Sequence, residues 1–199
     1  MPKIIDKAEK KQLIVRAALA VFAKKGVSNT KIADIAEAGG FGKGTIYDYF
    51  RSKDEIFMAA FSHFDELMKT EIARRMFLIT DPQKKLMTFI EASFEIWLEH
   101  ADFAEIMFDY WAEGIRDRHD NIDLQAIYDE YGDFIAAILD DGTRKGVFRN
   151  MDSKMVAAFI IAGMDGLVLQ WLVHKKKFPV LDARKEFIKT ILQGISRRD

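Results

Sequence analysis

The sequence predicts an all-α protein of nine helices, and three observations support this fold class. Apolar residues recur at the spacing of three and four positions that gives a helix one buried face. No segment alternates apolar and polar residues as a half-buried strand does. The chain has only three prolines, and none of them interrupts a long periodic segment. We therefore expect nine helices and essentially no sheet.

The first two predicted helices are separated by a loop that begins with a glycine. Residues 6–25 carry one apolar stripe with helical spacing, and Gly26 is the expected stop. Thr30 is the predicted N-cap of a short second helix, which ends at Gly39 and Gly40. Both glycines permit the positive φ that a sharp turn requires.

A short third helix is expected at residues 43–50, and a long fourth helix follows it. Ser52 and Glu55 have the spacing of a capping box, in which each side chain accepts a hydrogen bond from the other residue's backbone N–H. The apolar face of the fourth helix consists of Ile56, Phe57, Ala60, Phe61, Phe64, Leu67 and Met68.

The remaining five helices are expected at residues 82–97, 103–111, 124–139, 153–174 and 181–196. Pro82 follows Asp81 as a proline in the first turn of a helix would. Asp152 can cap the eighth helix, and Gly142 and Gly146 mark the end of the seventh.

The charges of the chain are distributed unevenly. Its 199 residues have a net charge of −1, but up to residue 53 there are eleven basic and five acidic residues. The net charge is therefore +6 in this segment and −7 in the rest of the chain. A basic segment predicts contact with phosphates. The absence of cysteine removes disulfides, thiolate metal sites and cysteine nucleophiles, and it fits a reducing cytosol.

One segment is apolar enough to raise the question of a membrane. Residues 155–173 form the longest apolar stretch, which Asp165 and Gln170 interrupt. A buried helix explains this stretch better than a membrane span. The first residues lack the apolar core of a signal peptide. We therefore expect a cytoplasmic protein with no membrane partner.

Residues 30–53, TKIADIAEAGGFGKGTIYDYFRSK, carry the most informative pattern. Two short helices joined by a glycine turn and braced by a preceding amphipathic helix form a helix-turn-helix pattern, whose second short helix can enter a DNA major groove. Lys43 and Lys53 would bracket the phosphate backbone, to which hydroxyl groups also donate. The residues expected to contact DNA are Thr30, Gly42, Lys43, Gly44, Thr45, Tyr47, Asp48, Tyr49 and Lys53.

Asp48 is an unexpected member of this set because its carboxylate would face anionic DNA. Two interpretations stay open. It can accept a hydrogen bond from a cytosine amino group, or it can lie on the flank beside Lys43 or Arg51.

This segment resembles the DNA-binding region of the TetR family of bacterial repressors. That family has a capping Thr, then Asp-Ile-Ala, Ala-Gly-Val-Ser-Lys-Gly-Thr-Leu-Tyr-x-Tyr-Phe and Ser-Lys, and the chain matches this pattern over about its first 60 residues. Two departures are Gly39, where the family has alanine, and Gly42, where it has the serine that caps the recognition helix. Glycine is nearly as good an N-cap as serine, but a hydroxyl group that could touch phosphate is absent. The nine-helix layout is also similar to that family.

The resemblance implies an inducer cavity among the middle helices. The candidate lining residues are Phe61, Phe64, Met68, Phe94, Trp97, Met107, Trp111, Phe134, Met164 and Asp165. Any of the apolar ones can equally be ordinary core. Asp165, within an apolar helix, needs a partner. It can orient a polar ligand group or form a hydrogen bond across a subunit boundary.

The last two helices carry more apolar surface than one small body would bury. The resemblance implies a homodimer with a four-helix interface, which would cover this surface. Gly163 and Gly166 would let another helix approach closely. The predicted interface residues are Val156, Phe159, Ile160, Gly163, Gly166, Leu167, Trp171, Ile188, Ile191 and Ile195.

These observations predict a ligand-responsive transcriptional repressor with a DNA-binding domain at residues 1–53 and a ligand-binding and dimerisation domain at 54–199. Its partners would be a palindromic double-stranded DNA operator and a hydrophobic or aromatic small-molecule inducer, with no cofactor. We expect no enzyme activity. The segment 39–45 lacks the Gly-Lys-Ser/Thr of a nucleotide loop because Gly44 intervenes, and the four histidines have no zinc-ligand spacing. Two alternatives are a helical small-molecule-binding or catalytic protein with a vestigial head, and an architectural DNA binder without a ligand.

Overall fold

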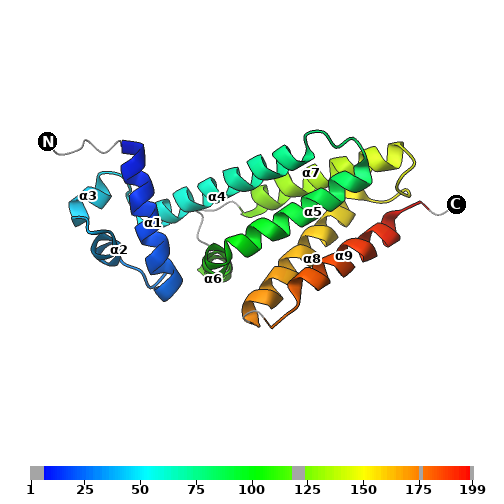
Figure 1. Cartoon of the computed structure of the whole chain (residues 1–199). Coiled ribbons are helices and arrows are strands. Elements are labelled where there is room, and N and C mark those ends of the chain that lie inside the picture. Colours follow the sequence, from blue (N-terminus) through cyan, green and yellow to red (C-terminus); the bar gives the residue numbers. More distant parts are fainter. Residues whose placement is uncertain (1–6, 118–123, 175–176, 198–199) are drawn as a thin grey trace. The chain divides into compact units, whose positions relative to one another are not determined.

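The computed structural model describes residues 7–117, 124–174 and 177–197, and it confirms the all-α fold class. Within those ranges there are nine helices and no named strand, and the one isolated β-bridge pairs Phe148 with Ser196. The helices, labelled in Figure 1, are α1 (Lys7–Lys25), α2 (Ile32–Gly39), α3 (Lys43–Tyr47), α4 (Lys53–Met76), α5 (Pro82–Glu99), α6 (Ala101–Asp117), α7 (Leu124–Arg144), α8 (Ser153–Val173) and α9 (Val180–Ile195).

The chain divides into two compact units. The head unit comprises the described residues within Met1–Leu67 and Ala101–Ile122, and the body unit comprises those within Met68–His100 and Asp123–Asp199. Helix α4 contributes residues to both units, and α6 belongs to the head unit. The expected division of function at residue 53 is a separate matter and stays a prediction.

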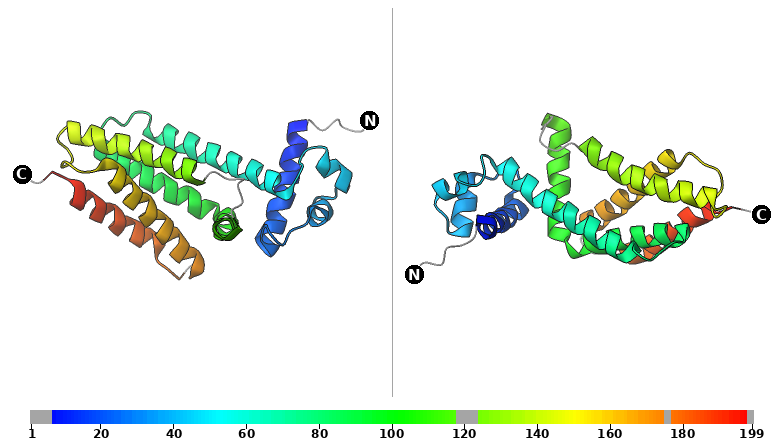
Figure 2. Two further views of the ribbon diagram at one scale, coloured as in Figure 1. Left: turned by 180° about the vertical axis from the view of Figure 1, so that it is seen from behind. Right: turned by 90° about the horizontal axis from the view of Figure 1, so that it is seen from above.

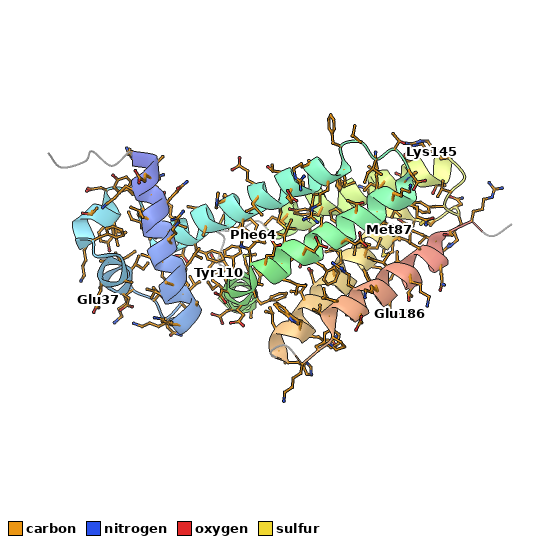
Figure 3. All side chains as sticks on the ribbon, viewed as in Figure 1. Glu37, Phe64, Met87, Tyr110, Lys145 and Glu186 are labelled. Atoms are coloured by element: carbon orange, nitrogen blue, oxygen red, sulfur yellow. The ribbon has the colours of Figure 1, made fainter. Side chains whose placement is uncertain are left out.

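The head unit is built around α1, which packs on α2 and on α6. Figure 2 shows α1 grouped with the two short helices that follow it. The ring of Phe57 stacks on Tyr110 with centroids 4.0 Å apart, and Phe22 meets Phe57 edge-on at 6.3 Å. Phe64 and Tyr110, both labelled in Figure 3, are buried in this unit. Burial of such side chains stabilises the folded head unit by about 1.5–3 kcal/mol for each large residue.

In the body unit α5 is the central helix, with α7, α8 and α9 packed on it. Leu86, Ile90 and Phe94 of α5 are almost fully buried. Helix α7 packs on α8, and α8 packs on α9. Figure 1 shows α8 and α9 running side by side.

Two predicted N-caps, at Ser52 and Asp152, are confirmed, and Asp81 caps α5 in the same way, directly before the predicted first-turn Pro82. The side chains of Asp81 and Asp152 accept hydrogen bonds from the backbone N–H groups of the third residues after them, at 2.7 and 3.0 Å. Ser52 Oγ accepts from the N–H of Glu55 at 3.1 Å. Glu55 returns the contact one residue earlier than predicted, because its carboxylate accepts from the N–H of Arg51.

The prediction that Thr30 caps the second helix is wrong. Lys31 is the N-cap of α2, and its backbone N–H donates to the side chain of Asp34 at 2.9 Å. Thr30 is 2% exposed, and its hydroxyl donates to the carbonyl of Gly26 at 2.7 Å. Its side chain therefore closes the loop between α1 and α2 from inside.

Two glycines have a different role from the one predicted. Gly40 has the expected positive φ of 65°, but Gly39 does not, and Gly142 lies inside α7 rather than at its end. A Cβ on Gly39 would lie 2.2 Å from the ring of Phe41, and a Cβ on Gly142 would lie 2.1 Å from the ring of Phe148. Both positions are small because an aromatic ring packs directly on the backbone.

Candidate DNA-binding and ligand-binding sites

The helix predicted to enter the major groove is α3, which is shorter than predicted. It has five residues, begins after Gly42 and is followed by Asp48 as its C-cap. Ile46 is fully buried, so this side of α3 faces the core of the head unit. Lys43 is exposed, and Tyr47 has 57% of its surface exposed. The short helix is thus anchored by one side chain and presents polar side chains on its outer surface.

The predicted DNA contacts differ in their exposure. Five of them are exposed and three are half-buried, whereas Thr30 is buried with its hydroxyl already used inside the head unit. The exposed residues are Gly42, Lys43, Gly44, Tyr47 and Asp48, and the half-buried ones are Thr45, Tyr49 and Lys53. The position of Thr30 does not support a phosphate contact from its side chain.

The two lysines expected to bracket the DNA backbone have different surroundings. The ammonium group of Lys53 donates a hydrogen bond to the carbonyl of Ser28, which ties the loop after α1 to the start of α4. Lys43 has no hydrogen-bond or ion-pair partner for its ammonium group in the part of the chain that the structure describes. Lys43 is therefore the better placed of the two for a phosphate.

Asp48 is exposed, and within the described ranges no ion pair joins it to Lys43 or Arg51. The flank position proposed for it therefore brings no charge pairing with these neighbours, and a contact with a cytosine amino group stays open.

The turn between α2 and α3 depends on Phe41, which the sequence analysis did not select. Its ring covers Gly39, its backbone N–H donates to the carbonyl of Ala36 at 2.8 Å, and the ammonium group of Lys10 lies 4.4 Å from the ring centroid. A cation over an aromatic face is attractive. The signal available in the sequence was a large aromatic residue directly after a glycine pair.

The body unit contains two cavities that bear on ligand binding. The first, about 510 Å³, lies between α4, α5 and α7 and is lined by Lys69, Ile72, Ala73, Met76, Phe77, Lys85, Phe89, Glu130, Tyr131 and Phe134. The second, about 480 Å³, lies between α7 and α8 and is lined by Tyr128, Asp129, Gly132, Asp133, Lys154, Ala158, Ile161, Ala162 and Asp165.

Two of the predicted ligand-binding residues line these cavities. Phe134 lines the first cavity, and Asp165 lines the second. The other eight line neither of the two. Phe64, Met68, Phe94, Met107 and Met164 are buried, and Phe61, Trp97 and Trp111 are half-buried. The buried five fit the alternative reading, in which they are core.

Asp165 has a partner within its own chain. The hydroxyl of Tyr128 donates to its carboxylate at 2.8 Å. Burial raises the pKa of Asp165, and the hydrogen bond from Tyr128 partly offsets this increase. Burial and the nearby carboxylate together raise the pKa of Tyr128. The pair links α7 to α8 at the wall of the second cavity.

The predicted dimer-interface residues lie on different sides of α8 and α9. Phe159 is 66% exposed, whereas Ile160, Ile188 and Ile195 are buried in the body unit itself. Gly163 packs against the ring of Phe187 in α9, since a Cβ there would lie 2.5 Å from it, so it serves packing within the chain. The remaining residues, Val156, Gly166, Leu167, Trp171 and Ile191, are half-buried.

The apolar sequence of α8 had suggested a buried helix, but α8 is only partly buried in this chain. By length and composition α8 could cross a membrane, yet only 22% of its most apolar 18-residue stretch is buried. Ala157, Ile160, Met164 and Val168 form its buried stripe. Its exposed apolar side chains are Met155, Phe159, Leu169 and Val173. This exposed side of α8 is the candidate site of contact with an apolar surface of a partner.

Two family models match the chain. The model of the bacterial regulatory proteins of the tetR family matches residues 14–60. The model of the C-terminal region of BetI-type transcriptional repressors matches residues 82–195, which is more than half of the chain.

Relatives and solved structures agree with these matches. The transcriptional regulator BetI of Proteus mirabilis is 26% identical over 93% of this chain and 91% of its own length. A transcriptional regulator from Saccharomonospora viridis in complex with choline is 26% identical, with a TM-score of 0.84 over 96% of this chain and 100% of that one. The regulator FadR from Bacillus subtilis in complex with stearoyl-CoA, at 23% identity over 92% of this chain and 98% of that one, has the same fold with a TM-score of 0.74. The chain therefore belongs to the TetR family of ligand-responsive, DNA-binding transcriptional regulators.

Proposed function

We propose that the protein is a homodimeric repressor that binds a palindromic DNA operator and is released by a hydrophobic or aromatic small molecule. The observation that carries this proposal is the construction of α3. Ile46 is fully buried beneath it, while Lys43 and Tyr47 are exposed above. A helix-turn-helix uses such a surface to contact bases and phosphates in the major groove.

Dimerisation is supported by the exposed apolar side of α8. Phe159 and Val173 have about two-thirds of their surface exposed, at 66% and 68%. Exposed apolar area of this kind is removed from water when a second copy covers it. Two heads would then bind half-sites separated by about one turn of DNA, roughly 34 Å.

The ligand would act through α4, which is the one helix among those described that contributes to both units. A ligand bound in the body unit would shift α4 and thereby lower the affinity of the heads for the operator. A coupling of about 1–3 kcal/mol is sufficient for such a response. The two structural neighbours bind choline and stearoyl-CoA, which differ in charge and size. These two neighbours therefore do not define a single ligand class for this chain. As a regulator of this kind the protein would act in the cytoplasm and would have no catalytic activity.

The test is binding of the purified protein to the DNA upstream of its own gene, measured by fluorescence anisotropy at several salt concentrations. We expect saturable binding that weakens steeply with salt, and Tyr47→Ala should abolish it without changing the dimer. Because the side chain of Tyr47 is 57% exposed, this change leaves the core intact.

Absence of salt-sensitive binding to any duplex DNA would contradict the proposal and favour the alternative of a vestigial head. Binding without any response to a panel of hydrophobic and aromatic compounds in a thermal-shift assay would favour an architectural DNA binder instead.

A further inference from the structure

The first cavity of the body unit has an apolar wall made by three helices. Ile72 and Met76 of α4 are buried side chains that form part of this wall. The ring centroid of Phe89 in α5 lies 5.6 Å from that of Phe134 and 6.5 Å from that of Tyr131, both in α7. These three rings form a continuous aromatic surface. A volume of about 510 Å³ is within the usual range of small-molecule sites.

The mouth of this cavity leaves large apolar side chains in contact with water. Phe77 is 84% exposed and Phe134 is 42% exposed, and both line the cavity. Covering such area with an apolar ligand removes it from water, which favours binding. The geometry therefore fits a flexible apolar chain better than a polar ligand.

Of the charged side chains that line this cavity, Lys85 alone lacks an ion-pair partner among the described residues. Lys69 forms an ion pair with Glu130 at 2.7 Å, so these two charges compensate each other. Lys85 also lines the cavity, one helical turn before Phe89 on the same side of α5. Among the residues described, nothing forms an ion pair with the ammonium group of Lys85.

The second cavity has the opposite character. Three carboxylates line it, those of Asp129, Asp133 and Asp165, and its lysine, Lys154, is paired with Asp133 at 3.2 Å. An anion would be repelled there and attracted by the first cavity. The difference in charge thus assigns anionic ligands to one of the two cavities.

We propose that the cavity between α4, α5 and α7 binds an acyl chain with an anionic head, with the chain on the aromatic wall and the head facing Lys85. This inference rests on the proposed function, because it names the class of small molecule that the regulator would sense. A free fatty acid and an acyl thioester share this chemistry.

The first experiment measures binding directly, by calorimetry on the full-length protein without DNA. The probes are octanoate, decanoate and dodecanoate below their micellar concentrations, with dodecylamine as the cationic counterpart. Each added methylene group should strengthen binding roughly three- to fourfold. Dodecylamine should bind at least tenfold more weakly than dodecanoate. Decanoyl-CoA is compared with decanoate, and whichever binds more tightly identifies the source of the acyl chain.

Two variants with matched controls test the placement. Lys85→Gln should weaken dodecanoate binding about tenfold, whereas Lys84→Gln, on the same helix but outside the cavity, should not. Ala73→Trp should fill the cavity and abolish binding. Ala73 is exposed, so the variant should still fold, and Ala137→Trp is its control on an exposed site outside the cavity.

Dodecanoate binding without dependence on chain length, or equal losses in Lys85→Gln and Lys84→Gln, would overturn this inference. The DNA-binding assay is read separately. Operator binding that persists while all acyl probes fail would overturn the acyl site and leave the proposed function intact. Acyl binding that follows the predicted pattern without any DNA binding would overturn the proposed function and leave the acyl site intact.

Discussion

Helices α3 and α8 expose opposite kinds of side chain. On α3 the buried residue is the apolar Ile46, and the exposed ones include Lys43 and the hydroxyl-bearing Tyr47. On α8 the buried stripe is apolar too, but most of the exposed side chains are also apolar, with Phe159 and Val173 largely in solvent. The inner side of each helix is buried by apolar packing, so only the outer side is available to a partner. The polar outer side of α3 suits a hydrated, charged partner such as DNA. The apolar outer side of α8 suits another apolar surface, so the two helices indicate two different partners.

The largest expected effect comes from placing a charge on the exposed apolar surface of α8. Phe159→Glu should convert a dimer to monomers at micromolar concentration and weaken operator binding at least a hundredfold. The reason is that a carboxylate buried without a partner costs about 3–5 kcal/mol. Sedimentation velocity measures the first effect and anisotropy the second. Leu78→Glu, at a position 86% exposed elsewhere in the body unit, is the control that should remain dimeric. A dimer that survives Phe159→Glu would refute this interface.

Next in size is the loss of a phosphate contact on α3. Lys43→Gln should reduce the slope of the logarithm of the operator-binding constant against the logarithm of the salt concentration. The expected reduction is roughly 0.9 per head, or about 1.8 for a dimer. Lys24→Gln removes the same charge from an exposed position on α1 and should change the slope less. Equal changes in the two variants would mean that Lys43 acts only through overall charge. Lys53→Gln should additionally lower thermal stability, because Lys53 donates to the carbonyl of Ser28.

The turn before α3 offers an effect of intermediate size. Gly39→Ala would place a Cβ 2.2 Å from the ring of Phe41 and should destabilise the head unit by about 1–3 kcal/mol, measured by chemical denaturation. Gly39→Ala combined with Phe41→Val restores the family pattern and should recover part of that loss. Additive effects of the two changes would show that Gly39 and Phe41 are not coupled.

The sequence predicts features that depend on residue spacing better than features that depend on how side chains pack. The caps at Asp81, Asp152 and Ser52 were predictable because each depends on residues within one turn. The roles of Gly39 and Gly142 were not, because they depend on the aromatic rings that cover them. An apolar stripe also does not tell whether the adjacent space is filled. Phe94 is core, Phe134 lines a cavity and Phe159 faces solvent, although all three share helical spacing.

A smaller effect is expected from the one carboxylate within α8. Burial raises the pKa of Asp165 above its ordinary value of 3.8, so its ionisation opposes folding. Asp165→Asn keeps an acceptor for Tyr128 and should raise the melting temperature at pH 7, by about 2–4 °C for each kcal/mol recovered. The advantage should be complete above the raised pKa and should vanish as the pH falls towards 3.8. Thermal melts of both proteins across this range measure it, and a constant difference would show that the carboxylate is not responsible.

The smallest effect concerns the N-cap of α3 itself, where the chain has Gly42. Gly42 has φ −70° and ψ 145°, an extended conformation that serine adopts without strain. A Cβ there would lie 3.7 Å from Thr45 Oγ1, which is ordinary contact. Gly42→Ser should therefore add a side-chain cap and stabilise the head unit by only a few tenths of a kcal/mol. Its effect on DNA is the more informative measurement, since the new hydroxyl would sit on the exposed side of α3. Tighter operator binding with almost unchanged stability would place residue 42 against a phosphate, whereas unchanged binding would confine the DNA contact to Lys43 and the residues after it.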